Sequence, residues 1–130
     1  MKKIDRVQFS TGAAVGSAGA ATSTGCCPHV AGRVLAVHVA YVGSPPAGTT
    51  DVTLEDEADP AVEKIVNLEN AATDVKIYPR RVLETNDGTD LTYDGTRKVY
   101  GCYVVHGRLK ATIAGANSGD SATVTVWLGV

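Results

Sequence analysis

The sequence predicts an all-β protein, folded as an antiparallel β-sandwich or jelly roll with an extended N-terminal arm. Val and Thr are abundant, and β-branched side chains favour the pleated, half-buried surface of a sheet. Short segments of alternating apolar and polar residues recur along the 130 residues, separated by turn-forming Gly, Pro and Asp. No segment has a convincing helical period, which disfavours a parallel sheet with crossover helices.

The expected strands follow in order along the chain. Residues 4–10 alternate, and residues 33–42 are apolar on both faces, which predicts a central strand. The last two strands are 108–114, with Leu109, Ala111 and Ile113 inward, and 123–128, with Val124, Val126 and Leu128 inward. They are expected to form a hairpin across the polar turn 115–120. The other expected strands or extended segments are residues 51–55, 64–68, 74–84, a short strand around Leu91 and Tyr93, and 97–106. Gly107 is expected to interrupt the strand after residue 106, as a bulge. Tight turns are expected at residues 86–88 and 94–95.

Residues 11–25 contain almost only small side chains, with no large apolar group to bury. Such a segment cannot offset its own ordering entropy, so its composition by itself favours a flexible linker. Order in it requires the surface of the domain or of a neighbouring subunit. We therefore expect two parts, a first strand with an extended arm over residues 1–25 and a β-sandwich domain over residues 26–130.

The three cysteines, Cys26, Cys27 and Cys102, predict no disulfide framework, because their number is odd and two of them are adjacent. Cys26, Cys27 and His29 lack the paired spacing of a zinc site. We expect free thiols and neither a metal nor a cofactor.

No catalytic motif is found, so the chain is not expected to be an enzyme. The glycine-rich segment around Gly16 lacks the Lys-Ser/Thr of a phosphate loop, and there is no Gly-x-Ser-x-Gly or His-Glu-x-x-His pattern. His38 lies on a mostly apolar face and is interpreted as structural. The acidic run within residues 51–63 lacks the spacing of a calcium loop and is interpreted as a solvated edge.

Charge and hydropathy disfavour two classes of partner. A net charge of −2 is unlike the basic surface of a nucleic-acid binder. The longest apolar run, 34–42, is far shorter than the roughly 20 residues of a membrane span. The polar N-terminus predicts no signal peptide, and hence a reducing compartment.

Four segments of the C-terminal half form a recognisable pattern: Tyr78-Pro79-Arg80-Arg81, Thr85-Asn86-Asp87-Gly88, Val105 to Ala114 and Ala122 to Leu128. In these segments the chain resembles small virion proteins of tailed bacteriophages. The resemblance implies a capsid decoration, or cement, protein on the virion surface, assembled in the host cytoplasm. It implies the major capsid protein and further copies of the chain, as a homotrimer, as partners.

The expected protein-interface residues are Val7, Phe9, Gly12, Val15, Gly16, Gly19, Gly25, Arg80 and Arg81. Two alternatives stay open. One is another phage structural role, in the tail or at the head–tail joint. The other is a ligand-binding β-sandwich such as a carbohydrate-binding module, for which one Trp, one Phe and five Tyr offer few stacking surfaces.

Overall fold

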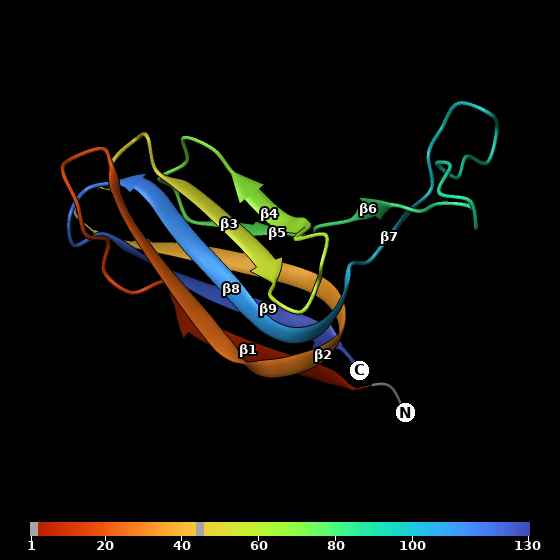
Figure 1. Ribbon diagram of the computed structural model, residues 1–130, viewed down its shortest axis with the longest axis horizontal. Helices are drawn as coiled ribbons and strands as arrows, with labels where there is room; N and C mark the ends of the chain where they lie inside the picture. The colour runs from red at the N-terminus through yellow and green to blue at the C-terminus, as the bar shows by residue number, and fades with distance from the viewer. Residues whose placement is uncertain (1–2, 44–45) are drawn as a thin grey trace.

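The computed structural model describes residues 3–43 and 46–130, and this part of the chain is all β, without a helix. No helix long and apolar enough to cross a membrane was found there. The strands are β1 (Ile4–Ser10), β2 (Ala21–Val42), β3 (Asp51–Asp56), β4 (Lys64–Leu68), β5 (Val75–Ile77), β6 (Arg81–Val82), β7 (Tyr100–Gly101), β8 (Val104–Ala116) and β9 (Ser121–Gly129) (Figure 1). The prediction of an antiparallel all-β fold is confirmed.

The long strand β2 organises the main sheet, whose order is β1-β9-β2-β8-β3-β4 with β5 also on β2. Its first part pairs with β8 and its second part with β9, and the change of partner falls at Arg33. Figure 1 shows β2 curving sharply between these two parts. Gly32 permits the close approach at the bend, because its φ is +139° and a Cβ there would lie 2.6 Å from the carbonyl oxygen of Gly129.

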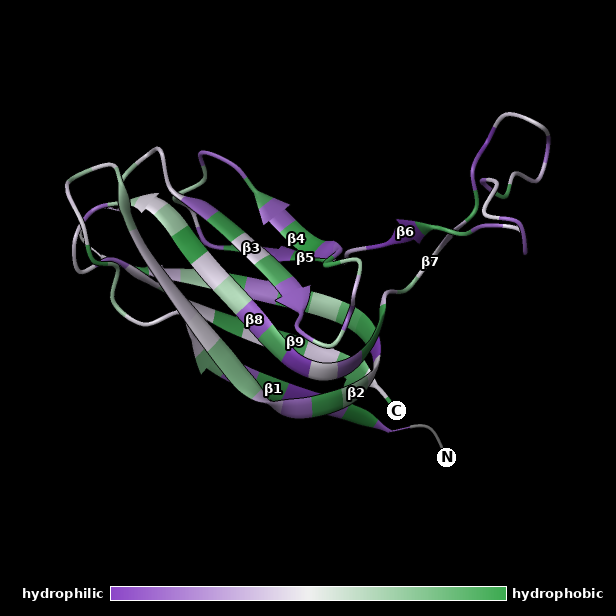
Figure 2. Ribbon diagram, in the orientation of Figure 1, coloured by the Kyte–Doolittle hydropathy of each residue, from purple (hydrophilic) through white to green (hydrophobic). Residues whose placement is uncertain are grey.

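The core forms where the inward faces of these strands meet. In β8, Leu109, Ala111 and Ile113 are fully buried, and in β9, Val124 and Val126 are. These are the residues that the alternating pattern predicts to face inward. Figure 2 shows the alternation along the strands of the main body.

The predicted hairpin of the last two strands is wrong. β8 pairs with β2 and β3, whereas β9 pairs with β1 and β2, so β2 lies between them in the sheet. The turn after Ala116 therefore connects strands that are not partners. Alternation reports which face of a strand is buried, and two strands with the same pattern need not be neighbours.

The structure does not confirm an extended N-terminal arm. Residues 21–25 are the start of β2, and the loop before them packs on the domain itself. Ala14 is buried and its N–H donates to the carbonyl oxygen of Asp120 at 2.7 Å, while Val15 forms a β-bridge with Thr22. The order of this segment thus comes from its own domain, and no neighbouring subunit is needed to explain it.

An extension formed by residues 79–103 projects from the main body (Figure 1). Main-chain hydrogen bonds link Leu83, Leu91 and Val99 to one another, and β6 pairs with β7. The turns predicted at 86–88 and 94–95 are present, with Gly88 and Gly95 at φ of +88° and +82°. The single strand expected over 97–106 is wrong, because β7 ends at Gly101 and β8 begins at Val104.

Gly107 lies within β8 and does not interrupt it. A Cβ at this position would lie 2.5 Å from a carboxylate oxygen of Asp56 and 2.6 Å from the Cβ of Ala58. The glycine is therefore explained by close packing of the loop after β3 against β8 rather than by the end of a strand.

Candidate functional site

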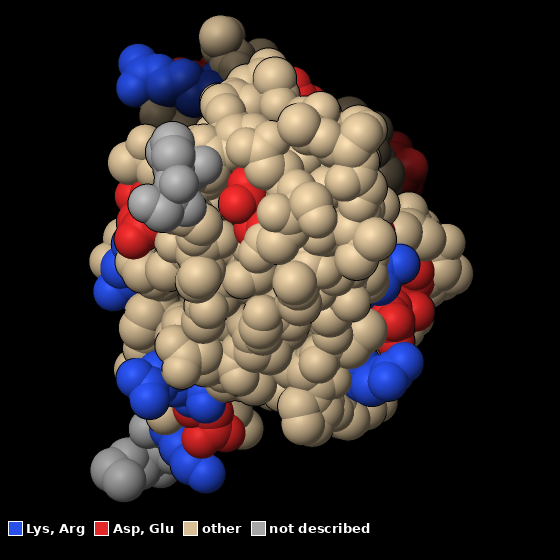
Figure 3. Space-filling view, turned by 90° about the vertical axis from the view of Figure 1, so that its left-hand side faces the viewer, with Lys and Arg blue, Asp and Glu red and all other residues tan. Residues whose placement is uncertain are grey.

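Three loops that are distant in the sequence form one end of the main body, and together they carry almost no charge. We call residues 11–20, 46–50 and 115–120 the loop end; Asp120 is its only Lys, Arg, Asp or Glu. The sequence has no such residue between Arg6 and Arg33, or between Arg33 and Asp51. Figure 3 shows this end as a broad uncharged surface with most charged groups at its margin.

Buried Asp120 ties the loops together. Its carboxylate accepts hydrogen bonds from the N–H groups of Asn117 at 3.1 Å and Ala47 at 3.4 Å. Its carbonyl oxygen accepts the N–H of Ala14, whose own carbonyl oxygen accepts the N–H of Gly119 at 2.8 Å. Asp120 thus contacts all three loops. Hydrogen bonds from N–H groups to an ionised carboxylate are stronger than bonds between neutral groups, so Asp120 holds the loops in place.

Further cross-loop bonds hold the exposed part of the loop end. The N–H of Gly19 donates to the side-chain oxygen of Asn117 at 3.2 Å, and the hydroxyl of Thr49 donates to the carbonyl oxygen of Gly115 at 2.7 Å. Val15 is 76% exposed and projects from this framework. The loop end therefore presents small, uncharged groups around one apolar side chain on a fixed backbone.

The structure brings together four of the nine expected interface residues: Gly12, Val15, Gly16 and Gly19 all lie in the loop end. Val7 and Phe9 instead point inward from β1 and pack against the core. Gly25 lies inside β2 against the main chain of Ser10. Residues 46–50 and 115–120 were missed, although their low density of charge, with Asp120 as the single acidic or basic residue, could have indicated them.

Arg80 and Arg81 lie where the extension leaves the main body, and both already have partners. Arg80 donates to the carbonyl oxygens of Leu35 at 3.1 Å and Pro79 at 2.8 Å. Arg81 forms ion pairs with Glu63 at 3.4 Å and Glu84 at 2.9 Å. These contacts anchor the extension.

A groove of about 360 Å³ at the base of the extension is lined by Asp56, Asp59, Glu63 and Arg81, among others. Its carboxylates are used by the protein itself. Asp56 accepts the N–H groups of Ala58 and His106, at 2.9 and 2.8 Å. Asp59 accepts the N–H groups of Ala61 and Glu63, at 3.0 and 3.1 Å. The groove is thus built from loop-stabilising groups, which supports a structural interpretation.

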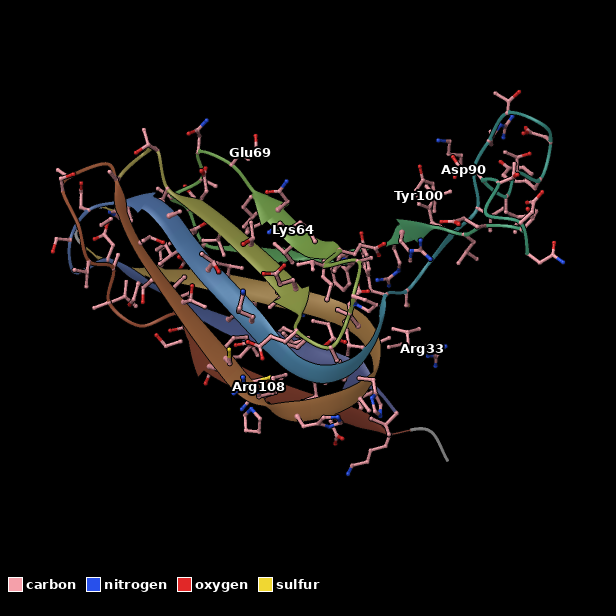
Figure 4. The ribbon with its side chains drawn as sticks, viewed as in Figure 1. Arg33, Lys64, Glu69, Asp90, Tyr100 and Arg108 are labelled. Carbon is pink, nitrogen blue, oxygen red and sulfur yellow. The ribbon has the colours of Figure 1, made fainter. Side chains whose placement is uncertain are left out.

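The acidic run is only in part the solvated edge that the sequence predicted, since Glu55 and Asp56 are buried whereas Glu57 is exposed. Glu55 lies between Lys110 of β8 at 3.3 Å and Lys64 of β4 at 3.7 Å (Lys64 is labelled in Figure 4). Cross-strand pairing on neighbouring strands accounts for its burial, a relationship that is invisible in the sequence.

The three cysteines are free and occupy different environments. Partial burial raises the pKa of the Cys26 thiol, and its hydrogen bond to Glu57 at 3.2 Å raises it further. Burial raises the pKa of Cys27, whose sulfur accepts the N–H of Leu109 at 3.3 Å. Neither thiol has the lowered pKa of a reactive cysteine. Among residues 3–43 and 46–130, no three or more His, Cys, Asp or Glu side chains form a metal-binding group.

The tip of the extension contains a carboxyl group with a strongly lowered pKa. The Thr85 hydroxyl and then the Thr89 N–H hydrogen-bond to Asp87 and lower its pKa to about 2. Since this pKa is lower when the chain is folded, the ionised carboxylate stabilises the turn above the pKa of an unfolded aspartate. That contribution is lost as the pH falls through about 2.

We predict that Asp87 titrates near pH 2 in an NMR titration of its carboxyl carbon. Thr85→Val removes the first hydrogen bond and should move the midpoint upward, toward the ordinary value of 3.8. Thr96→Val in the neighbouring turn should leave it unchanged. A wild-type midpoint near 3.8 would contradict the hydrogen-bonded turn.

The fold and the site define a small antiparallel all-β domain with a hydrogen-bonded loop end that carries almost no charge. No protein-family model matches the chain, and no curated protein matches it. Among solved structures, the chain is similar to FlhE, described as "Crystal Structure of FLHE", with 17% identity, coverage of 96% of each chain and a TM-score of 0.44. This degree of similarity assigns no function.

These findings correct the expected resemblance to small virion proteins of tailed bacteriophages. The similarity found is to FlhE, and no family model or curated protein supports a virion match. The segments that suggested the resemblance have local explanations: Asn86-Asp87-Gly88 forms a turn, and Gly107 permits close packing of a loop on β8. Short motifs of turn and packing residues recur among unrelated β proteins.

Proposed function

We propose that this chain is a non-enzymatic structural protein, a β-sandwich-like platform that binds protein surfaces through its loop end and associates with further copies of itself. The observation that carries the proposal is the loop end, three uncharged loops fixed by Asp120 with Val15 exposed at their surface. A virion location and the major capsid protein as partner were expected only through the resemblance, and they are left out of this proposal.

The physical chemistry of the loop end suits protein contact. An uncharged surface is desolvated at lower cost than a charged one. Small side chains lose little rotamer freedom on burial, and loops that are already ordered lose little backbone freedom. Small side chains around one projecting valine also allow close approach of another main chain. Val15 would then act as the buried anchor of the contact.

The alternative of a carbohydrate-binding face receives less support from the side chains. Trp127, the single Trp, lies on β9, and the Lys76 ammonium stands 4.4 Å from the centroid of its ring. The same ammonium lies 5.6 Å from the ring centroid of Tyr78. Lys76 thus lies over one face of each of these two rings and would compete with a sugar ring for stacking there.

The proposal is tested by sedimentation velocity over a concentration series. We expect an oligomer whose mass is two or more times the 13.5 kDa of one chain. A mass three times that of one chain would identify the expected trimer. Val15→Lys should weaken association by about tenfold or more, because it buries an unpaired charge. Val104→Lys is the matched control, since Val104 is also 76% exposed but lies outside the loop end. A monomer at every concentration, or equal effects of the two variants, would contradict self-association through the loop end.

A further inference from the structure

Two histidines lie side by side on the outer surface of β2 and β8. His29 pairs with Arg108 in the ladder, and Ala31 pairs with His106, so the two imidazoles are diagonal neighbours across the strands. Their ring centroids are 4.9 Å apart and their planes are nearly perpendicular, at 89°. Both residues are exposed. Arg108, labelled in Figure 4, marks this face of the sheet.

The backbone under the pair is fixed while the rings are free to turn. Ladder pairing fixes both strands, and the N–H of His106 also donates to the Asp56 carboxylate at 2.8 Å. Within residues 3–43 and 46–130, no hydrogen bond involves a ring nitrogen of either histidine. Rotation about side-chain bonds is therefore enough to direct one nitrogen of each ring toward a shared point.

The guanidinium of Arg108 and the thiol of Cys26, which could interfere with a ligand of the two imidazoles, are both bonded to Glu57. Arg108 bonds to the Glu57 carboxylate through two of its nitrogens, at 2.7 and 3.0 Å. The Cys26 thiol donates to the other oxygen of Glu57 at 3.2 Å. Glu57 thus holds both the nearby cation and the nearby thiol, and the imidazole pair faces solvent.

We propose that His29 and His106 form a two-imidazole site for a divalent late first-row transition ion, of the class Ni²⁺, Cu²⁺ or Zn²⁺. Neutral imidazole nitrogen is a preferred ligand of these ions, and water completes the remaining positions. With two protein ligands the site is weak and exchangeable, unlike a closed structural zinc site with four. The site lies on the face of the sheet, outside the loop end, and stands independently of the proposed function.

The probe is Ni²⁺, which avoids oxidation of the Cys26 thiol, titrated calorimetrically into the full chain in a non-chelating buffer at slightly alkaline pH. We expect one ion per chain. His29→Ala and His106→Ala should each weaken binding by about tenfold or more, because the second imidazole acts at high effective concentration.

Two control variants make the test specific. His38→Ala removes the remaining histidine, half-buried on β2, and Cys26→Ser removes the exposed thiol of the same strand. Both variants should bind Ni²⁺ as the wild type does. Thermal unfolding of each variant confirms that it is folded. The proposal is overturned if the wild type binds no Ni²⁺, if folded His29→Ala and His106→Ala bind as well as the wild type, or if Cys26→Ser rather than His106→Ala abolishes binding.

Discussion

Replacing Leu109 by alanine is expected to lower the free energy of unfolding by about 2–5 kcal/mol, the range typical of truncating a fully buried leucine. Leu109 lies in β8 with no exposed surface, and its neighbours along the inward face, Ala111 and Ile113, are equally buried. β8 pairs with β2 on one side and β3 on the other, so both strands limit how far the core can collapse into the cavity. Because a closely packed site of this kind relaxes little, we expect the loss of unfolding free energy to lie above the lower end of this range.

Urea unfolding of the variant measures this loss. Val104→Ala serves as the control, because Val104 begins the same strand but is 76% exposed. Its substitution should change the free energy of unfolding by less than about 0.5 kcal/mol. An equal loss in both variants would show that β8 does not present Leu109 to the core as described.

Replacing Gly25 by valine is expected to destabilise the protein by about 1–3 kcal/mol or more, as overpacking of a tight contact does. A Cβ at Gly25 would lie 1.9 Å from the carbonyl oxygen of Ser10 and 3.0 Å from the Cα of Thr11. Both atoms belong to the main chain, so no flexible side chain can move aside. The end of β1 would have to separate from β2, and the loop that begins at Thr11 would move with it.

Hydrogen exchange and urea unfolding together test this expectation. The amides of Ile4–Ser10 should exchange faster in Gly25→Val, in addition to the loss of stability. The control is Gly48→Ala, because a Cβ at Gly48 meets no atom within 4 Å and its φ lies outside the left-handed region. That change should be neutral or slightly stabilising. Unchanged exchange and stability in Gly25→Val would refute the close contact between β1 and β2.

The alternation of side chains was enough to locate most strands. Residues 4–10, 51–55 and 64–68 coincide with β1, β3 and β4 to within a residue, and the buried faces of β8 and β9 were predicted correctly. Turn chemistry was equally local, since Gly88 and Gly95 have the positive φ expected of them. Period-two burial and left-handed glycine are properties of a few consecutive residues, and the sequence displays them directly.

Strand partners were not predictable in the same way. The expected hairpin of β8 and β9 was wrong because each pairs with a different part of β2, which starts 12 residues earlier than the expected strand over 33–42. The small-residue segment expected to be an arm is held by the carbonyl oxygen of Asp120 and by Thr22. Pairing is decided by the total surface that all strands bury together, which no local window contains.

The sequence alone therefore determined that this protein is an antiparallel β domain and which residues of β8 and β9 face its core. A contact role for the segment with Gly12, Val15, Gly16 and Gly19 stays a prediction. The tertiary structure alone decided that this segment joins two other uncharged loops through Asp120, that Glu55 and Asp56 are buried, and that His29 meets His106. The physical reason is range. Propensity and periodicity act between residues a few positions apart, whereas these contacts join segments whose proximity exists only after the whole sheet has formed.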